Sequence, residues 1–268
     1  MHKKLLLFFT PFYLQAVVEW EIIIPTYNNE KWCIQNIKSL VHQTYPHWHA
    51  SVIVDCATDN TESLLREYIA QRKLEDKITL TVNTENKGAL ANIYNAATAC
   101  APHKVIGLLD GDDWFAHDHV LEKLSKIYEK ENIWMTFGQF ELWPENRIGH
   151  CRPYPKEIVK NNSFRYIRGL LPSHFRTFYA WLFQLIDKED LLYQGKFFPV
   201  AWDMAMMFPM IEMAGKHQKC ISEVLYIYNI DNPLNDFKLY TGLQAELDRF
   251  IRAKKCYKPL GKNYEKLF

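Results

Sequence analysis

The chain has 268 residues, of which 48% are hydrophobic and 24% charged, and its formal net charge is +1 at pH 7. This length suits one compact catalytic domain, and the apolar content is enough for a full core, which excludes bulk disorder. The charge is nearly neutral and has no dominant basic run, which excludes a protein held to nucleic acid by bulk electrostatics. We therefore expect no nucleic-acid partner.

The first 18 residues form a segment of their own. Lys3 and Lys4 precede an apolar stretch that runs to Val18 and contains Pro11. A basic start followed by an apolar run is typical of a secretory signal or of an arm that associates with a membrane. The stretch is shorter than a typical membrane span. An apolar arm packed on the domain, or a mis-set start codon, is the alternative interpretation.

The six cysteines are scattered along the chain, and no two lie within four residues of each other. This spacing excludes a zinc knuckle or a CxxC redox pair. It favours buried thiols in a reducing compartment over an extracytoplasmic disulfide set. We expect a location in the cytoplasm or at a membrane, with the secretory pathway as the alternative.

The first half of the chain alternates between short apolar runs and segments with helical spacing. Strands are predicted at residues 19–25, 51–55, 77–82 and 105–109, and helices at residues 30–43, 60–72 and 87–100. Short buried strands separated by helices predict an α/β fold, with a mostly parallel sheet and helices on both faces. Ligands of such sheets bind beyond the carboxyl ends of the strands.

The second half is less regular. A loop is predicted at residues 141–160, helices at residues 175–186, 204–214 and 240–257, and a strand at residues 224–228. Ser173 is the predicted N-cap of the first of these helices, and Asp203 is a candidate cap of the second. Pro209 is expected to kink the second helix.

The sharpest feature is Asp110-Gly111-Asp112-Asp113, directly after a buried strand. Carboxylates held this close repel one another and raise each other's pKa values unless a cation joins them. Mg²⁺ and Mn²⁺ take carboxylate and diphosphate oxygens as ligands, and Gly111 permits the sharp turn such a site needs. A solvated acidic turn is the alternative.

Polar residues follow the other predicted strands as well. They are Pro25, Thr26, Tyr27 and Asn28 after the first strand, Asp55 after the second, and Asn86, Lys87 and Gly88 after the third. Backbone amides and small polar side chains at such ends can cradle a nucleotide, and Gly88 allows a close approach. The alternatives are helix capping by Thr26 or Asn28, a turn aspartate at Asp55 and a solvent-facing Lys87.

These four motifs, in this order and with Thr58-Asp59 after Asp55, resemble the family 2 glycosyltransferases of GT-A fold over roughly residues 19–230. The resemblance implies transfer of a sugar from a nucleotide sugar, usually a UDP-sugar, to a glycan, lipid or protein acceptor. It also implies a divalent metal, Mn²⁺ or Mg²⁺, and inversion at the anomeric carbon. Asp55 would contact the base, Asp110 the ribose or the metal shell, and Asp112 the metal.

The chain departs from the family pattern in two places. Cys56 and Ala57 stand where the family has a paired acid and a glycine. The usual Ala-Arg-Asn after the Asn-x-Gly motif is missing, with Asn92 and Asn95 nearby instead. These changes leave the fold expectation standing and weaken any assignment of the base or the sugar.

An inverting transfer needs a general base for the acceptor hydroxyl. The resemblance implies that Asp203 is this base, and Trp202 beside it is the candidate for stacking on an acceptor sugar. His174 and Arg176 are expected at the start of a helix and are candidates for binding the leaving diphosphate. His174 could also reach the metal. The alternative interpretations are that Asp203 caps its helix, that Trp202 packs in the core, and that His174 and Arg176 form a surface pair.

The expected organisation is one domain in two halves. Residues 19–140 would bind the nucleotide sugar, and residues 141–268 would form a more helical acceptor side. The alternatives are an inactive nucleotide-sugar or glycan-binding module and a sugar nucleotidyltransferase. The second usually has a glycine-rich basic loop near its start, which the segment from residue 25 to residue 30 lacks.

Overall fold

The computed structural model describes residues 17–167, 172–235, 238, 241–261 and 264. Almost all of the expected N-terminal segment, residues 1–18, lies outside this range. None of the helices within it is both long enough and apolar enough to span a bilayer.

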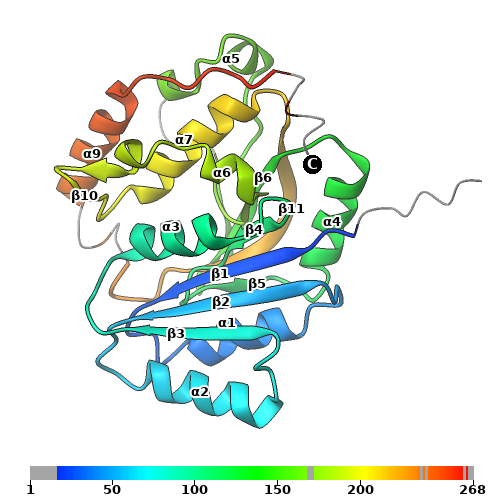
Figure 1. Ribbon diagram of the computed structural model, residues 1–268, viewed down its shortest axis with the longest axis vertical. Coiled ribbons are helices and arrows are strands. Elements are labelled where there is room, and N and C mark those ends of the chain that lie inside the picture. The colour runs from blue at the N-terminus through cyan, green and yellow to red at the C-terminus, as the bar shows by residue number, and fades with distance from the viewer. Residues whose placement is uncertain (1–16, 168–171, 236–237, 239–240, 262–263, 265–268) are drawn as a thin grey trace, which may run out of the picture.

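One sheet of nine strands forms the centre of the described chain (Figure 1). Its strands are β1 (Trp20–Thr26), β2 (Trp48–Asp55), β3 (Ile78–Asn83), β4 (Val105–Leu108), β5 (Trp114–Phe115), β6 (Met135–Trp143), β7 (Arg147–Ile148), β8 (Arg176–Tyr179) and β11 (Gln218–Asn229). Their order is β3-β2-β1-β4-β8-β6-β11-β5, with β7 paired to β6. The first four strands of this order are parallel, β8 is antiparallel to both neighbours, and β6 and β11 are parallel. The expected mostly parallel α/β sheet is confirmed.

Helices cover both faces of this sheet, as Figure 1 shows for α1 and α2 on one side and α3 on the other. The helices are α1 (Cys33–Val41), α2 (Thr61–Arg72), α3 (Ala89–Ala99), α4 (Val120–Lys130), α5 (Lys156–Lys160), α6 (Ala180–Gln184), α7 (Trp202–Ala214) and α9 (Thr241–Ala253). A short hairpin of β9 (Leu192–Tyr193) and β10 (Lys196–Phe197) precedes α7. The three helices predicted in the first half are confirmed, each a little shorter than expected.

The run of isoleucines in β1 follows from this layered arrangement. Ile22 and Ile24 pack in the core under α1, α2 and α4, whereas Ile23 packs in the core under α3, α6 and α7. Successive side chains of a strand point to opposite faces. A central strand with helices on both faces therefore has apolar side chains on both sides of the sheet, as β2 also does at Val52, Ile53 and Val54.

The helix predicted at residues 175–186 is wrong over its first part and confirmed only at Ala180–Gln184. Strand β8 occupies Arg176–Tyr179, and the short helix α6 begins at Ala180. The apolar residues there are spaced as on a helix, but β8 is inserted between β4 and β6, where both of its faces are covered. Burial on both faces removes the period-two pattern that marks a strand. Ser173 consequently caps no helix.

Three smaller expectations also change. The predicted loop at residues 141–160 holds the end of β6, strand β7 and helix α5. The predicted strand at residues 224–228 is the end of the longer β11. Helix α7 has Ala201 as its N-cap, so Asp203 lies in the first turn of that helix.

Helix α7 is tied to the rest of the second half by a buried ion pair. The Arg165 guanidinium donates two hydrogen bonds to the Glu212 carboxylate, at 2.5 and 2.9 Å, and both side chains are nearly inaccessible to solvent. The backbone N–H of Tyr257 donates to the same carboxylate at 2.9 Å. Loss of one member of such a pair leaves an uncompensated buried charge. The pair therefore fixes the position of the helix that carries Asp203.

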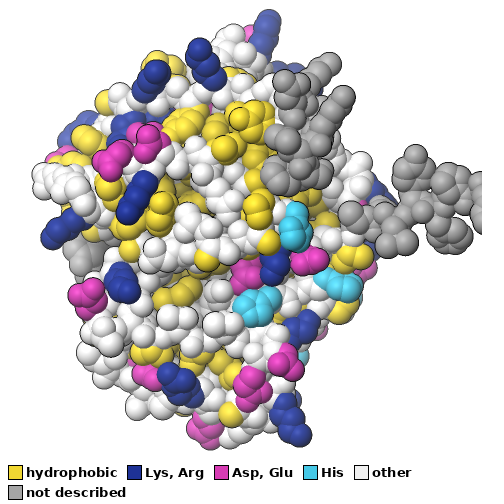
Figure 2. Space-filling view, in the orientation of Figure 1, with side chains coloured by type: hydrophobic (Ala, Val, Ile, Leu, Met, Phe, Trp, Pro, Cys, Tyr) yellow, Lys and Arg dark blue, Asp and Glu magenta, His cyan; other side chains and the backbone are white. Residues whose placement is uncertain are grey.

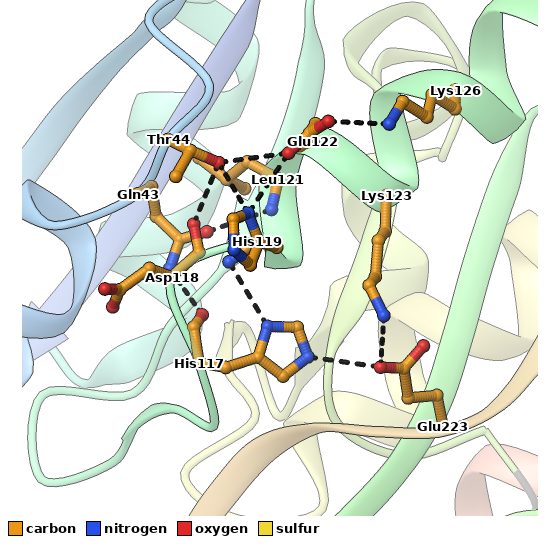
Figure 3. A network of polar contacts seen from close by, with 10 residues as sticks. All are labelled: Gln43, Thr44, His117, Asp118, His119, Leu121, Glu122, Lys123, Lys126 and Glu223. Carbon is orange, nitrogen blue, oxygen red and sulfur yellow. Dashed lines mark hydrogen bonds and ion pairs between the residues drawn. The ribbon is translucent and has the colours of Figure 1, made fainter.

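A polar network anchors the turn that follows the acidic motif (Figure 3). The Gln43 side chain, just past α1, donates to the His117 carbonyl at 2.9 Å and accepts from the Leu121 N–H at 3.0 Å. Glu223 of β11 contacts His117 and Lys123 from the other side. The network joins the end of α1, the start of α4 and β11 around this turn.

Candidate active site

A cavity of about 1220 Å³ lies at the carboxyl ends of β1, β2, β3 and β4. Of the residues expected to form a site, it is lined by Pro25, Tyr27, Asp55, Asn86, Lys87, Gly88, Asp110, Gly111, Asp112, His174, Arg176, Trp202 and Asp203. The first half supplies the ends of parallel strands. The second half supplies the start of β8, which reaches the same edge because β8 is antiparallel to β4, and the start of α7.

The acidic motif approaches β1 so closely that only glycine fits at position 111. A Cβ there would lie 2.5 Å from the Thr26 side chain and 2.9 Å from the Pro25 carbonyl. The Gly111 N–H donates to that carbonyl at 3.1 Å. Asn36 of α1 donates to the carbonyls of Asp110 and Asp113, both at 2.8 Å. The backbone of the motif is therefore held by β1 and α1 together.

Asp113 is the buried anchor of the motif. Its carboxylate is inaccessible to solvent and accepts from the Tyr226 hydroxyl and from the Asn229 N–H, both at 2.7 Å. Burial, and then the charges of Asp112 and Asp110, raise the pKa of Asp113 well above its usual value. The Tyr226 hydroxyl also accepts from the Asp110 N–H at 3.1 Å. Strand β11 thus completes the acidic site, a contribution that sequence reasoning missed.

His174 lies against Asp110, with 3.4 Å between its Nε2 and the Asp110 carboxylate. Its ring is stacked between Tyr226 and Tyr228, and its Nδ1 lies 3.1 Å from the Ser173 hydroxyl. Burial, and then the charge of Arg176, lower the pKa of His174 to about 4. The imidazole is therefore neutral near pH 7, the form in which histidine binds metals.

The pKa of Asp110 is lowered as well, in contrast to that of Asp113. Burial alone would raise it, but the contact with His174 and the charge of Arg176 outweigh burial and lower the pKa of Asp110 below its usual value. Asp110 is therefore an anion at neutral pH on the wall of the cavity.

The donor set of the acidic motif fits a divalent metal. One ligand atom each of Asp110, Asp113 and His174 lies within 4.8 Å of the others. Asp113 does not line the cavity and already accepts two short hydrogen bonds, whereas Asp110 and Asp112 both line it. The Asp112 carboxylate accepts from the Asn232 amide at 2.7 Å. Hard carboxylate oxygens with a neutral imidazole suit Mn²⁺ or Mg²⁺.

Asp55 holds the loop that follows β3. Its carboxylate accepts from the Lys87 N–H, the Gly88 N–H and the Asn83 amide, each at 2.8 or 2.9 Å. Gly88 has a φ of +83°, which favours glycine. Asp55 therefore positions the loop that forms this wall of the cavity. A ligand that contacts the Asp55 carboxylate would share it with these three donors.

Thr26 and Asn28 are not among the described residues that line the cavity. The Thr26 hydroxyl accepts from the Asn29 side-chain amide at 3.0 Å, and the side-chain oxygen Oδ1 of Asn28 accepts from the Thr58 N–H at 2.8 Å. Their side chains brace the loop after β1, while Pro25 and Tyr27 face the cavity.

Asp203, in the first turn of α7, lines the same cavity as the acidic motif. Its carboxylate accepts from Arg176 Nη2 at 3.1 Å and from the Met204 N–H at 2.9 Å, and the side chain is 27% exposed. Arg176 is almost fully buried, and its guanidinium lies 5.7 Å from the ring of Trp202. His174 and Arg176, two residues apart, therefore join the acidic motif to Asp203.

An α/β sheet with a carboxylate cluster at the carboxyl end of β4, and a second acid from a later helix in the same cavity, defines the class of GT-A glycosyltransferases. Residues 21–187 match the family described as Glycosyl transferase family 2, and the chain belongs to this family. It is accordingly a glycosyltransferase that uses a nucleotide-sugar donor.

Two curated relatives extend over most of the chain. A putative teichuronic acid biosynthesis glycosyltransferase of Bacillus subtilis, TuaG, is 30% identical over 250 residues, which is 90% of this chain and 94% of that protein. A putative colanic acid biosynthesis glycosyl transferase of Escherichia coli, WcaA, is 24% identical over 88% of this chain and 84% of its own length.

Solved structures share the fold. Staphylococcus aureus TarS in complex with UDP-GlcNAc superposes with a TM-score of 0.64 at 16% identity, over 92% of this chain and 69% of that one. A mannosyltransferase from Pyrobaculum calidifontis, in complex with GDP-Man and Mn²⁺, has a TM-score of 0.60 at 17% identity, over 90% and 66% of the two chains.

We expect Tyr226→Phe to destabilise the protein by ~1–3 kcal/mol, because it removes the hydroxyl that donates to the buried Asp113 and accepts from the Asp110 N–H. Denaturant unfolding measures the change. Tyr166→Phe is the matched control, since that side chain is exposed. Equal stability of the two variants would contradict the anchoring role of Tyr226.

Proposed function

We propose that this glycosyltransferase is metal-dependent and inverting, and that it moves a sugar from a UDP-sugar to a hydroxyl group of a glycan, lipid or protein acceptor. The observation that carries the proposal is the cavity itself. Asp110 and Asp112 line the same cavity as Asp203, and His174 and Arg176, which contact Asp110 and Asp203, link the two groups. An in-line displacement at a sugar carbon needs a leaving-group side and an acceptor side within one cavity.

On the donor side, Asp112 and Asp110 would hold the metal, with His174 as a further ligand. The bound cation supplies charge that neutralises the departing diphosphate. Asp55 and the loop at Asn86, Lys87 and Gly88 would take the base and ribose, as would Pro25 and Tyr27 at the end of β1. Arg176 adds a permanent positive charge in a nearly dry position, where its attraction for a diphosphate is weakly screened.

On the acceptor side, Asp203 would act as the general base. It removes the proton of the acceptor hydroxyl as that oxygen bonds to the anomeric carbon from the face opposite the diphosphate. The bond from that carbon to the diphosphate oxygen breaks in the same step, so the configuration inverts. The hydrogen bonds from Arg176 and from the Met204 N–H fix the carboxylate in place. Trp202, next to Asp203 on the cavity wall, would stack on the acceptor.

A thermal-shift series tests donor and metal together. We expect the melting temperature to rise with one class among UDP-, GDP- and CDP-sugars, UDP-sugars in this proposal, and to rise more with Mn²⁺ than without it, since ligands that bind only the folded state stabilise it. Asp112→Asn should lose the Mn²⁺-dependent part. Asp118→Asn, an exposed aspartate outside the cavity, is the control. A well-folded wild-type protein with no shift in any condition would refute the proposal.

For the base, we expect Asp203→Asn to lower the rate of transfer by about 10²–10⁴-fold. Donor affinity should change little, because the amide keeps the size of the carboxylate and the metal side is untouched. Release of UDP during turnover measures the rate, and titration of UDP with Mn²⁺ measures the affinity. Near-normal turnover by the variant would rule out Asp203 as the base.

A further inference from the structure

Two cysteine sulfurs lie side by side away from the active-site cavity. The Sγ atoms of Cys151 and Cys220 are 3.8 Å apart, although 69 residues separate them in the chain. Cys151 is buried, and its backbone is held by Gln139 of β6, which both donates to it and accepts from it. Cys220 lies on β11 and is partly exposed. A disulfide needs the two sulfurs to approach by only about 2 Å more.

Cys220 is reached through a second cavity, of about 380 Å³. Its walls include Phe137 and Tyr154, and its lysines are Lys156, Lys160 and Lys216. All three lysines are exposed, and within the described part of the chain none of them has an acidic partner. In the upper part of the face in Figure 2, hydrophobic side chains lie among Lys, Arg, Asp and Glu side chains. An anionic ligand of small size suits this cavity.

We propose that Cys220 is a thiol-modification site for small anionic disulfides, which the three lysines attract, and that Cys151 then resolves the product into an intramolecular disulfide. Nothing in this inference depends on the transferase chemistry.

The two exchange steps balance. The Cys220 thiolate attacks one sulfur of the small disulfide, the disulfide bond breaks, and one small thiolate leaves. The Cys151 sulfur then attacks the Cys220 sulfur, the mixed disulfide breaks, and the second small thiolate leaves with the proton of Cys151. The two cysteines are oxidised, and the small disulfide is reduced to two thiols.

The different pKa shifts of the two thiols favour this order of attack. The contact with the Cys151 thiol lowers the pKa of Cys220, whereas the same contact and burial raise the pKa of Cys151. The thiolate is the nucleophile in disulfide exchange, so the accessible member of the pair is the one that attacks first.

The pair also has a route to the active site. The Cys151 backbone hydrogen-bonds to the Gln139 side chain, and the N–H of the neighbouring Gly138 donates to the Ser173 carbonyl at 3.4 Å. The Ser173 hydroxyl contacts His174, which contacts Asp110. Movement of Cys151 toward Cys220 is therefore connected through Ser173 to the residue that contacts Asp110. We expect oxidation to weaken donor and metal binding.

The test treats the reduced full chain with oxidised glutathione, which is anionic, or with cystamine, a cationic disulfide, and follows the products by intact mass and peptide mapping. The Cys151–Cys220 disulfide should form several times faster with oxidised glutathione. Cys151→Ser should stop at a mixed disulfide on Cys220. Replacement of Lys156, Lys160 and Lys216 by glutamine should remove the preference for the anionic reagent, and Cys100→Ser should react as wild type does.

Three outcomes would overturn the proposal: no Cys151–Cys220 disulfide, earlier modification of Cys56 or Cys256, or equal rates with the two reagents. A second measurement, which rests on the proposed function, compares UDP with Mn²⁺ binding to oxidised and reduced protein. Weaker binding that dithiothreitol restores, and that Cys220→Ser does not show, supports the route through Ser173. Unchanged binding would exclude that route and leave the mass data to decide the modification site.

Discussion

Repulsion among three carboxylates at the end of β4 is the constraint on which the rest of this structure depends. Asp110, Asp112 and Asp113 occupy four consecutive positions with Gly111, and Asp113 is fully buried. Three crowded carboxylates, one of them fully buried, are unfavourable as anions unless donors or cations surround them. Hydrogen-bond donors and positive charge reduce this repulsion. Tyr226 and Asn229 donate to Asp113, Asn232 donates to Asp112, and His174 and Arg176 lie beside Asp110.

The same constraint explains why the second half of the chain is folded as it is. The donors on Asp113 come from β11, more than 110 residues away in sequence. His174 and Arg176 come from the start of β8, which is brought to the catalytic edge because it runs antiparallel to β4. The buried Arg165–Glu212 pair then holds α7, so that Asp203 lines the same cavity as the carboxylates. A GT-A glycosyltransferase site is thus assembled from segments that share one sheet edge.

Much of the first half could be predicted because its signals are local. The isoleucines of β1 and the helical spacing of α1 are visible within single short segments, and each acidic or glycine motif follows its own strand. Strand β8 could not be predicted, since only its position between β4 and β6 makes it a strand, and its apolar residues fit a helix equally well. The aspartates of the site were visible as a motif. The separate role of Asp113 and its Tyr226 partner was not, because burial and long-range hydrogen bonds leave no periodic trace in the sequence.

A crystal structure with UDP and Mn²⁺, with anomalous scattering recorded at the manganese edge, tests the central claim most directly. The account predicts one anomalous peak within coordination distance of the Asp112 and Asp110 carboxylates and of the UDP diphosphate, with the uracil toward Asp55 and the free space in front of Asp203 left for an acceptor. UDP bound in the cavity without a manganese peak at these carboxylates, or a peak only elsewhere on the protein, would contradict it.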